Sequence, residues 1–478
     1  MSKRNYLGDD GKFKPALLAD AILAKNKFIT IRQTDKIKWY DAENGYYCDR
    51  AESIIAEFVK EDLGDEYTSR IKNEVIANIM ALTYIEQEEL DKNKNLINMP
   101  NGVYSVKDKV LLEHRPEYYF TSVMPYKYNK EAKADEILNF LWSVSNHRFD
   151  MFFSLLEHIA WTLMPRNKFQ KMALLWGEGS NGKGTYLILV KNFAGKDNCA
   201  SANLEQLTNQ RFHVAGLYGK KVNLAGDINH NEPLENTAIL KQLRGEDTLT
   251  GEFKNGQPFQ FVFDGKCFFA ANKFPKTTDD TYGFNRSFSI LKFEAQFTDE
   301  NGAIDEDIIS KITQESQLSG LFNIAVEILE ILNKNTKFTF AYTPEEIRQI
   351  YKEKSDSAAW FIEQKLCYDP NGELFKVELQ EIYKQFCKDN RLITESEKAF
   401  KNALDNSGIR YGEGQKELRR FWKGLAFKKM EQQEQEPEKE QIPTNYQDFI
   451  RFYQNKTKSV TQITALTAYF SFVEYPKN

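Results

Sequence analysis

The sequence predicts an α/β fold divided into several domains. Lys171 to Phe297 alternates apolar runs of strand length with segments of helical periodicity, the pattern of a sheet covered by helices. At 478 residues the chain is also too long for one hydrophobic core. We expect an α+β N-terminal domain over 1–150, the α/β core with a helical subdomain over 151–335, a winged-helix-like domain over 336–429, and a flexible linker and tail over 430–478.

The N-terminal domain mixes helices and strands. Apolar side chains recur at helical spacing, whereas two shorter stretches alternate as strands, and Asn44-Gly45 favours a tight turn. The expected helices cover residues 15–25, 52–63, 68–82 and 134–144, and a further helix over 151–164 opens the core and leads into its glycine-rich loop. Strands are expected over 28–33 and 36–48, and mixed strand and loop over 95–106 and 109–128.

The pattern of the C-terminal part, from residue 304 to residue 427, predicts mainly helices. Residues 304–316 and 320–335 predict a helical subdomain, and helices, a short turn and the final strand-like run 421–427 are typical of a winged helix. Residues 430–443 are charged and poor in apolar side chains, so we expect a flexible linker there.

Composition narrows the class of protein. The 64 basic and 69 acidic residues give a net charge of −5, which excludes a wholly basic nucleic-acid coat but not a basic ring or cleft. The five cysteines form no CxxC pair and the five histidines no ligand cluster, which argues against a disulfide framework or a zinc site. No apolar run reaches membrane-spanning length and no signal peptide is evident, so we expect a cytoplasmic protein with no membrane partner.

The run from Leu174 to Val190 predicts a phosphate-binding loop between a buried strand and a helix. Glycines let backbone N–H groups converge on an anion, Lys183 adds positive charge, and the helix N-terminus points at the same place. Glycine-rich turns also occur without a ligand, but the order strand, loop, lysine and helix favours ATP. The expected contacts are Gly177, Glu178, Gly179, Ser180, Asn181, Gly182, Lys183, Gly184 and Thr185.

A magnesium ligand and a water-orienting group are expected further along the chain. The strand-like run 220–228 ends in Asp227, which could hold Mg²⁺ together with Thr185, or could simply cap a turn. Because Gly184 occupies the usual hydroxyl position and Ile228 follows Asp227, the metal-bound hydroxyl and the general base stay open. A second buried run ends in Asn272, 89 positions after Lys183, where an amide could orient the attacking water.

Three further sets of residues are candidates for charge stabilisation and DNA contact. Arg286 lies just before another predicted strand and could reach the ATP of a neighbouring subunit. The simpler alternative is that Arg286 forms an ion pair at the surface, and Arg211 and Arg244 are weaker candidates for the same role.

A predicted hairpin carries Phe253 and Lys254 at its tip and follows a helix that contains Lys241. These residues could contact a nucleic-acid strand, or the hairpin could be an ordinary exposed one. Near the C-terminal end, Arg419, Arg420 and Lys423 beside Trp422 could bind duplex DNA, or form a solvated wing around a core tryptophan.

Taken together, these motifs resemble superfamily 3 helicases. More narrowly, the chain is similar to the phage/plasmid and poxvirus-type primase-helicase family from about Phe13 to Lys429. The similarity runs through the motifs NMPNGVYSV, HRPEYYFTSVMPYKYNKEA, GEGSNGKGT, KKVNLAGDI, LKQLRGEDTLTGEFK, FFAANKFP and FNRSF. The resemblance implies an AAA+ P-loop ATPase that forms a homo-hexameric ring and moves 3′ to 5′ on single-stranded DNA. It assigns Lys183 to the phosphates, Asp227 to magnesium, Asn272 to a sensor, Arg286 to a trans-acting finger and Lys254 to DNA.

The function expected from this resemblance is a replicative DNA helicase of a mobile element. The alternative is an origin-binding initiator that uses ATP as an assembly switch, whereas the long hairpin and the multidomain layout argue against a small-molecule kinase. About 170 residues precede the phosphate loop, and they contain no carboxylate pair suited to primer synthesis. We therefore expect any priming to come from a separate primase-polymerase.

Overall fold

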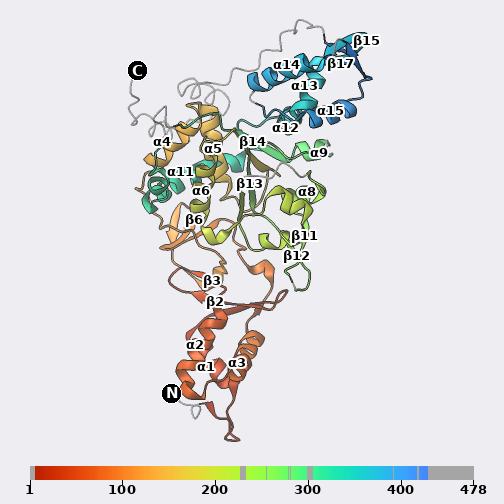
Figure 1. Ribbon diagram of the computed structural model, residues 1–478. Coiled ribbons are helices and arrows are strands. Elements are labelled where there is room, and N and C mark those ends of the chain that lie inside the picture. The colour runs from red at the N-terminus through yellow and green to blue at the C-terminus, as the bar shows by residue number, and fades with distance from the viewer. Residues whose placement is uncertain are drawn as a thin grey trace.

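The structure is a computed structural model that describes residues 6–210, 212–226, 233–254, 256–277, 279, 281–298, 305–390, 392–416 and 419–428. These residues form a mixed α/β protein in which a parallel sheet lies between an N-terminal unit and a C-terminal unit (Figure 1). No helix in the described ranges combines the length and the apolarity needed to cross a membrane.

The N-terminal unit packs three helices against a four-stranded sheet. Ile55, Val59 and Ile79 recur at helical spacing and are fully buried between the helices. The sheet order is β3-β2-β1-β4, and the turn between β2 and β3 contains Gly45 at a φ of 69°. The elements are α1 (Pro15–Lys25), β1 (Phe28–Ile31), β2 (Lys36–Asp41), β3 (Tyr46–Cys48), α2 (Ala51–Leu63), α3 (Ser69–Leu82) and β4 (Tyr84–Ile85).

A small antiparallel sheet links this unit to the core. It consists of β5 (Leu96–Met99), β6 (Gly102–Ser105) and β7 (Val110–Leu112). The Asn98 amide donates to the carbonyl of Asn44 at 2.9 Å, and the Tyr104 ring packs edge-on against Phe322 of the core at 5.2 Å between ring centroids. The sheet therefore contacts both neighbours.

The core sheet has the order β14-β8-β13-β10-β9, and every neighbouring pair is parallel. All five strands therefore share a carboxyl edge and, opposite it, an amino edge. Strand β13 follows β10 in the chain but lies between β8 and β10, so the ends of β8 and β13 are neighbours. The strands are β8 (Met172–Trp176), β9 (Cys199–Ala200), β10 (Val222–Ala225), β13 (Lys266–Ala271) and β14 (Phe288–Lys292).

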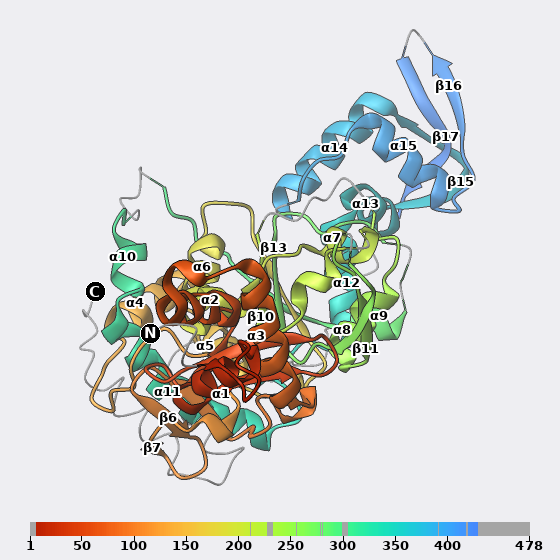
Figure 2. The ribbon, with the colours of Figure 1, turned by 90° about the horizontal axis from the view of Figure 1, so that it is seen from below.

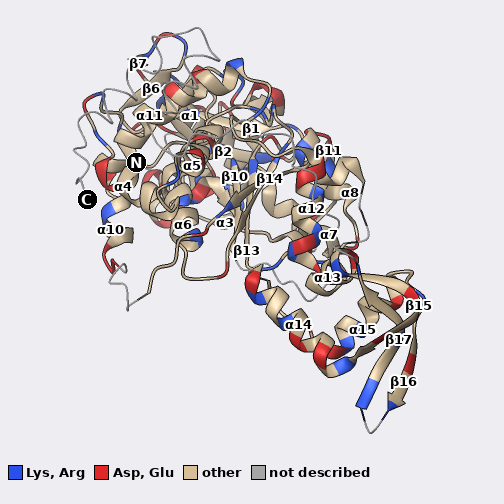
Figure 3. Cartoon of the chain, turned by 90° about the horizontal axis from the view of Figure 1, so that it is seen from above, with Lys and Arg blue, Asp and Glu red and all other residues tan. Residues whose placement is uncertain are grey.

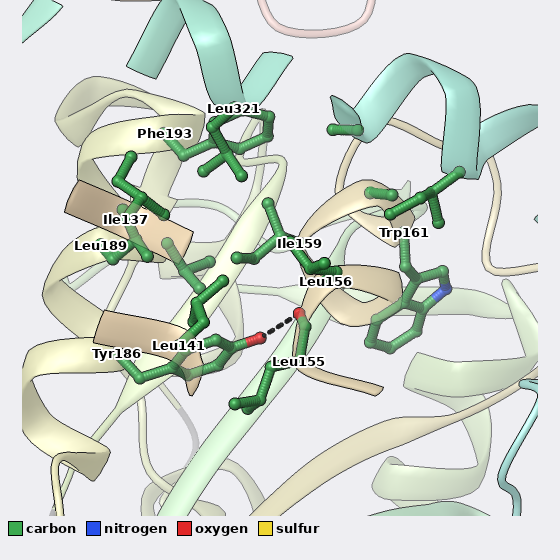
Figure 4. Close-up of a cluster of buried hydrophobic side chains, with 14 of the residues drawn as sticks. Ile137, Leu141, Leu155, Leu156, Ile159, Trp161, Tyr186, Leu189, Phe193 and Leu321 are labelled. Atoms are coloured by element: carbon green, nitrogen blue, oxygen red, sulfur yellow. Dashed lines mark hydrogen bonds between the residues drawn. The ribbon is translucent and has the colours of Figure 1, made fainter. Parts of the chain in front are cut away.

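Helices cover both faces of this sheet, because alternate side chains of its apolar strands point to opposite sides. Ala173 and Leu175 face the layer of α4 (Asp135–Val144), α5 (Phe149–Trp161), α6 (Lys183–Ala194) and α11 (Glu315–Lys334). Leu174 and Trp176 face the layer that contains α7 (Leu204–Asn209), α8 (Ala238–Gly245) and α12 (Pro344–Ser355). Within the first layer, the Tyr186 hydroxyl donates to the carbonyl of Leu155 at 2.9 Å (Figure 4).

Shorter elements and the C-terminal unit complete the chain. The predicted hairpin forms from β11 (Thr248–Gly251) and β12 (Phe259–Val262), and α9 (Tyr282–Asn285) and α10 (Ile308–Ile312) lie in connections. The C-terminal unit projects away from the core (Figure 2) and packs three helices on a sheet of order β15-β17-β16. Its elements are α13 (Ser357–Lys365), β15 (Leu366–Phe375), α14 (Lys376–Asp389), α15 (Glu397–Asn406), β16 (Gly412–Lys416) and β17 (Arg419–Phe427).

The structure confirms the α/β class, shows that the core sheet is parallel, and corrects one helix. The helix expected over 304–316 is only Ile308–Ile312 in the described residues, because its apolar residues fill one turn and Gln314 already caps α11. The domain boundaries and the winged-helix assignment stay predictions.

Candidate functional site

The predicted phosphate loop connects the carboxyl end of β8 to the first turn of α6. Backbone N–H groups hold its start: that of Gly177 donates to Ala271 at 3.4 Å, and that of Phe293 donates to Trp176 at 2.7 Å. The Asn181 amide, inside the loop, donates to the carbonyl of Phe293 at 3.1 Å. Neighbouring strands on both sides of β8 therefore fix the loop.

Two loop positions require glycine. A Cβ at Gly177 would lie 1.9 Å from the Asn181 amide nitrogen and 2.6 Å from the carbonyl oxygen of Phe293. Gly182 has a φ of 84°, and a Cβ there would lie 2.5 Å from a methyl carbon of Val144. The loop is thus compact, which brings its backbone close to any ligand at its centre.

Lys183 is buried at the centre of this loop, with 7% of its surface exposed. Its Nζ donates to the carbonyl oxygen of Gly177 at 2.6 Å, to Oδ1 of Asn181 at 3.0 Å and to Oδ1 of Asn272 at 3.0 Å. Lys183 also begins α6, whose first N–H groups have no acceptor within the helix. An ammonium group and a helix N-terminus therefore converge, as an anion site requires.

Asn272 comes directly after β13, the parallel neighbour of β8. The Trp176 indole N–H donates to its carbonyl at 3.0 Å, which leaves the side-chain oxygen to accept from Lys183. The structure therefore brings together the two residues that the sequence placed 89 positions apart.

The predicted magnesium ligands are only partly described. Asp227 and the weaker arginine candidate Arg211 lie outside the described residues, whereas β10 ends at Ala225 on the same carboxyl edge. Thr185 is the third residue of α6, close in sequence to Lys183. Within the described ranges no group of three His, Cys, Asp or Glu side chains could hold a metal ion. Asp227 and Thr185 stay predictions.

Arg286 lies on the other edge of the sheet from Lys183. It caps α9 two residues before β14, and β14 runs parallel to β8 in the register Phe288 to Met172. A strand of five residues spans about 16 Å at ~3.3 Å per residue. Arg286 therefore cannot reach the phosphate loop of its own chain.

Arg286 belongs to a cluster of three cations on the amino edge. Arg286 and Arg244 both donate to Oε1 of Gln170, at 3.3 and 3.2 Å, and Lys171 donates to the carbonyl of Phe288 at 3.1 Å. Burial and then the two guanidinium groups lower the pKa of Lys171 to about 8. Burial and Arg286 lower the pKa of Arg244, although the Asp247 carboxylate opposes this. Lys171 was not identified as a candidate from the sequence, because a single lysine before a predicted strand carries no specific signal.

Solved structures that are similar to this chain include two of one protein region. Two apo structures of the C-terminal region of NrS-1 align with TM-scores of 0.48 and 0.45, each at 12% identity. The alignments cover 86% and 87% of this chain, and 98% and 100% of the other chains.

Sequence comparison finds two family models and a relative that match this chain. The family described as D5 N terminal like matches residues 19–146, and a family of unknown function, DUF5906, matches residues 175–286. A protein of Acanthamoeba polyphaga mimivirus named "putative helicase" is 26% identical over 238 residues, or 47% of this chain and 25% of that protein. The match to the D5 family and the similarity to the mimivirus protein support a relationship of this chain to primase-helicases. It aligns with about a quarter of the length of this mimivirus relative.

The candidate DNA-binding residues of the hairpin and of α8 differ in their exposure. Lys254 is exposed, and the Phe253 ring stacks on Phe259 with 46% of its surface exposed. Lys241 of α8 instead forms an ion pair with Asp279 at 2.7 Å. Burial raises the pKa of Asp279, but hydrogen bonds from Lys241 and two threonine hydroxyls hold it well below its usual range. The Lys241 ammonium is therefore paired with the Asp279 carboxylate, whereas the Lys254 side chain is exposed to solvent.

The C-terminal basic residues do not share one face. Side chains alternate along β17, so Arg419 and Lys423 lie on one face and Arg420 on the other. Arg419 forms an ion pair with Glu378 of α14, and acidic and basic segments are interleaved across this unit (Figure 3). Trp422 is a core residue, 6% exposed, with the Lys376 ammonium 3.8 Å from its ring centroid.

Proposed function

We propose that this chain is a subunit of an ATP-driven DNA helicase: a homo-hexameric AAA+ ring of the superfamily 3 type that acts in replication of a phage- or plasmid-type element. The observation that carries the proposal is the contact of Lys183 with Asn272 at the carboxyl edge of the parallel sheet. In open α/β sheets, ligands bind outside this edge where the strand order reverses. The match of residues 175–286 spans both residues and Arg286.

ATP would bind with its outer phosphates against Lys183 and the first turn of α6. Phosphate oxygens would replace some of the neutral oxygens that now accept from Nζ, and charge-assisted hydrogen bonds are roughly twice as strong as neutral ones. Asn272, freed from Lys183, would then orient the attacking water. Asp227 and Thr185 would hold Mg²⁺, which supplies charge neutralisation on the phosphate oxygens.

The cationic cluster on the amino edge would complete the site of an adjacent subunit. Lys171, Arg244 and Arg286 hold one another in a repulsive arrangement that an anion would relieve. Because the cluster lies on the opposite edge from Lys183, only another subunit's phosphates can reach it in a ring. A hydrolysis step that needs two chains links ATP turnover to assembly, and Lys254 would carry the resulting motion to the DNA, 3′ to 5′.

Single-stranded-DNA-stimulated ATP hydrolysis and strand displacement test this function. Lys183→Ala should abolish hydrolysis, because the phosphates lose their buried cation. Arg286→Ala should also be inactive alone, yet mixing it with Lys183→Ala should restore part of the activity, since mixed interfaces contain one intact Lys183 and one intact Arg286. Full ATPase activity of Arg286→Ala as a monomer would refute the two-chain site.

The second candidate is an origin-binding initiator that uses ATP as an assembly switch. Arg420 and Lys423 in the C-terminal unit are exposed and could contact duplex phosphates. An initiator of this kind would hydrolyse ATP slowly, bind origin duplex and displace no strand. Displacement of a labelled strand from a forked substrate separates the two functions.

A further inference from the structure

Lys36 of the N-terminal unit lies beside the tip of the β11–β12 hairpin. It is the first residue of β2, after the turn from β1. Its Nζ is 5.8 Å from the centroid of the Phe253 ring and 5.9 Å from that of the Tyr218 ring. A residue of the region that matches the D5 family thus meets the hairpin of the ATPase core.

The rings under Lys36 form a continuous aromatic cluster of Tyr218, Phe253 and Phe259. Phe253 stacks on Phe259 with 5.3 Å between centroids and 21° between planes, and Tyr218 packs edge-on against Phe259 at 5.1 Å. The hairpin is also held close at the loop end of its strands, since a Cβ on Gly251 would lie 3.2 Å from Cα of Ala215. The cluster is therefore a fixed surface on a packed hairpin.

Two exposed lysines flank Phe253: Lys36 over its ring and Lys254 next in the chain. Neither forms an ion pair within the described part of the chain. Two carboxylates of the same unit have other hydrogen-bond partners: Asp49 pairs with Lys38, although the Lys36 charge also helps to lower its pKa, and Asp35 accepts from the Tyr84 hydroxyl. Both ammonium groups are therefore available to a ligand of opposite charge.

We propose that Lys36 and Tyr218 extend the hairpin into a composite site for single-stranded nucleic acid, in which the aromatic cluster stacks bases and Lys36 and Lys254 hold phosphates. This inference rests on the proposed helicase function and adds the N-terminal unit to its DNA contacts. Aromatic faces alternating with cations are the general means of binding a single strand without reading its sequence. Packing between units alone would not need two exposed lysines around a half-exposed ring.

Fluorescence anisotropy with a labelled oligothymidine, measured on the full chain across a salt series, tests the proposal. Each phosphate contact on a single strand contributes about 0.7 to the slope of log affinity against log salt concentration. Lys36→Gln and Lys254→Gln should each lower the slope by about that amount, and Lys36→Arg should keep it. Tyr218→Leu should weaken binding with little change of slope. Lys12→Gln, an exposed lysine of the same unit, is the control.

The outcomes separate the inference from the function on which it rests. If wild-type protein binds the strand, Lys254→Gln weakens binding and Lys36→Gln does not, the composite site is wrong while the helicase proposal stands. If Lys36→Gln lowers only the unfolding midpoint and leaves the salt slope unchanged, Lys36 is a packing contact and the inference also fails. If wild-type protein binds no single strand at all, the proposed function fails first. Equal affinity for duplex of the same length would contradict base stacking.

Discussion

Glu157 of α5 makes the stability of the core depend on pH in a direction opposite to that of most carboxylates. It is fully buried, and it accepts hydrogen bonds from the Thr339 backbone N–H at 3.0 Å and the Thr339 hydroxyl at 2.6 Å. Burial raises its pKa from 4.5 to about 7, although the two hydrogen bonds oppose this. The contact ties α5 to the segment that follows α11.

The sign follows from proton linkage. Between its unfolded pKa of 4.5 and its folded pKa of about 7, Glu157 binds more protons in the folded state, so its contribution to stability falls as pH rises. With these two values, the free energy of unfolding loses ~2.5 kcal/mol between pH 5 and pH 8, since one pKa unit corresponds to about 1.36 kcal/mol. Glu157→Gln removes this loss because glutamine does not titrate.

The titration of the neighbouring His158 changes the free energy of unfolding with pH in the opposite direction. Its effect must be distinguished from that of Glu157. Burial lowers its pKa from 6.5 to about 4, so its contribution to stability rises with pH through that window. Its ring stacks on Phe338 with 4.1 Å between centroids, and this arrangement is common to wild type and variant. The difference between the two proteins therefore isolates Glu157.

Urea unfolding at pH 5 and pH 8, followed by circular dichroism, measures this difference. The stability of Glu157→Gln relative to wild type should increase by ~2.5 kcal/mol from the lower to the higher pH, whatever the substitution costs at either pH alone. Glu157→Asp is a useful companion, since it keeps a titrating carboxyl in the same environment. Parallel pH profiles for wild type and Glu157→Gln would show that the carboxyl titrates normally and refute the reasoning.

Three further predictions concern the site and the C-terminal unit. Gly177→Ala should abolish ATP binding in calorimetry, because its Cβ would overlap Asn181, whereas Gly184→Ala has open space and should bind normally. The ATPase rate should fall as pH rises above about 8, where Lys171 loses its proton, and Lys171→Arg should move that fall to higher pH; an unchanged profile would contradict the role of Lys171. Trp422→Ala should destabilise the C-terminal unit by about 3–5 kcal/mol without loss of ATPase activity, checked by limited proteolysis and turnover.

Local patterns in the sequence were enough for most helices and strands and for the loop between β8 and α6, whose binding of phosphate stays a prediction. The helix expected over 15–25 is α1 with the same bounds, because apolar spacing, Pro15 at its start and short-range hydrogen bonds all act within the segment. The loop and Asn272 were also predictable, since a buried strand that ends in a polar residue places that residue on the carboxyl edge. Their adjacency in space depended on β13 lying beside β8, which the sequence did not specify.

Features that bring together side chains from distant segments could not be predicted from local sequence patterns. Lys171, Arg244 and Arg286 lie up to 115 positions apart and meet only because both arginines bond to Gln170. The contact of Lys36 with Phe253 likewise joins two units. The division of Arg419 and Arg420 between two faces of β17, by contrast, follows from strand alternation and was within reach of the sequence.

The common direction of the strands in the core sheet constrains which residues could take part in hydrolysing an ATP bound at Lys183. All five strands are parallel, so Lys183 and Asn272 lie on one edge and the cluster of Lys171, Arg244 and Arg286 on the other. A parallel sheet cannot bring its two edges together without unfolding, and no side chain spans the roughly 16 Å of β14. The three cations therefore either stay unused in hydrolysis or serve a second molecule of the chain. Activity that rises more steeply than linearly with protein concentration, and recovery of turnover in the Lys183→Ala and Arg286→Ala mixture, distinguish these two possibilities.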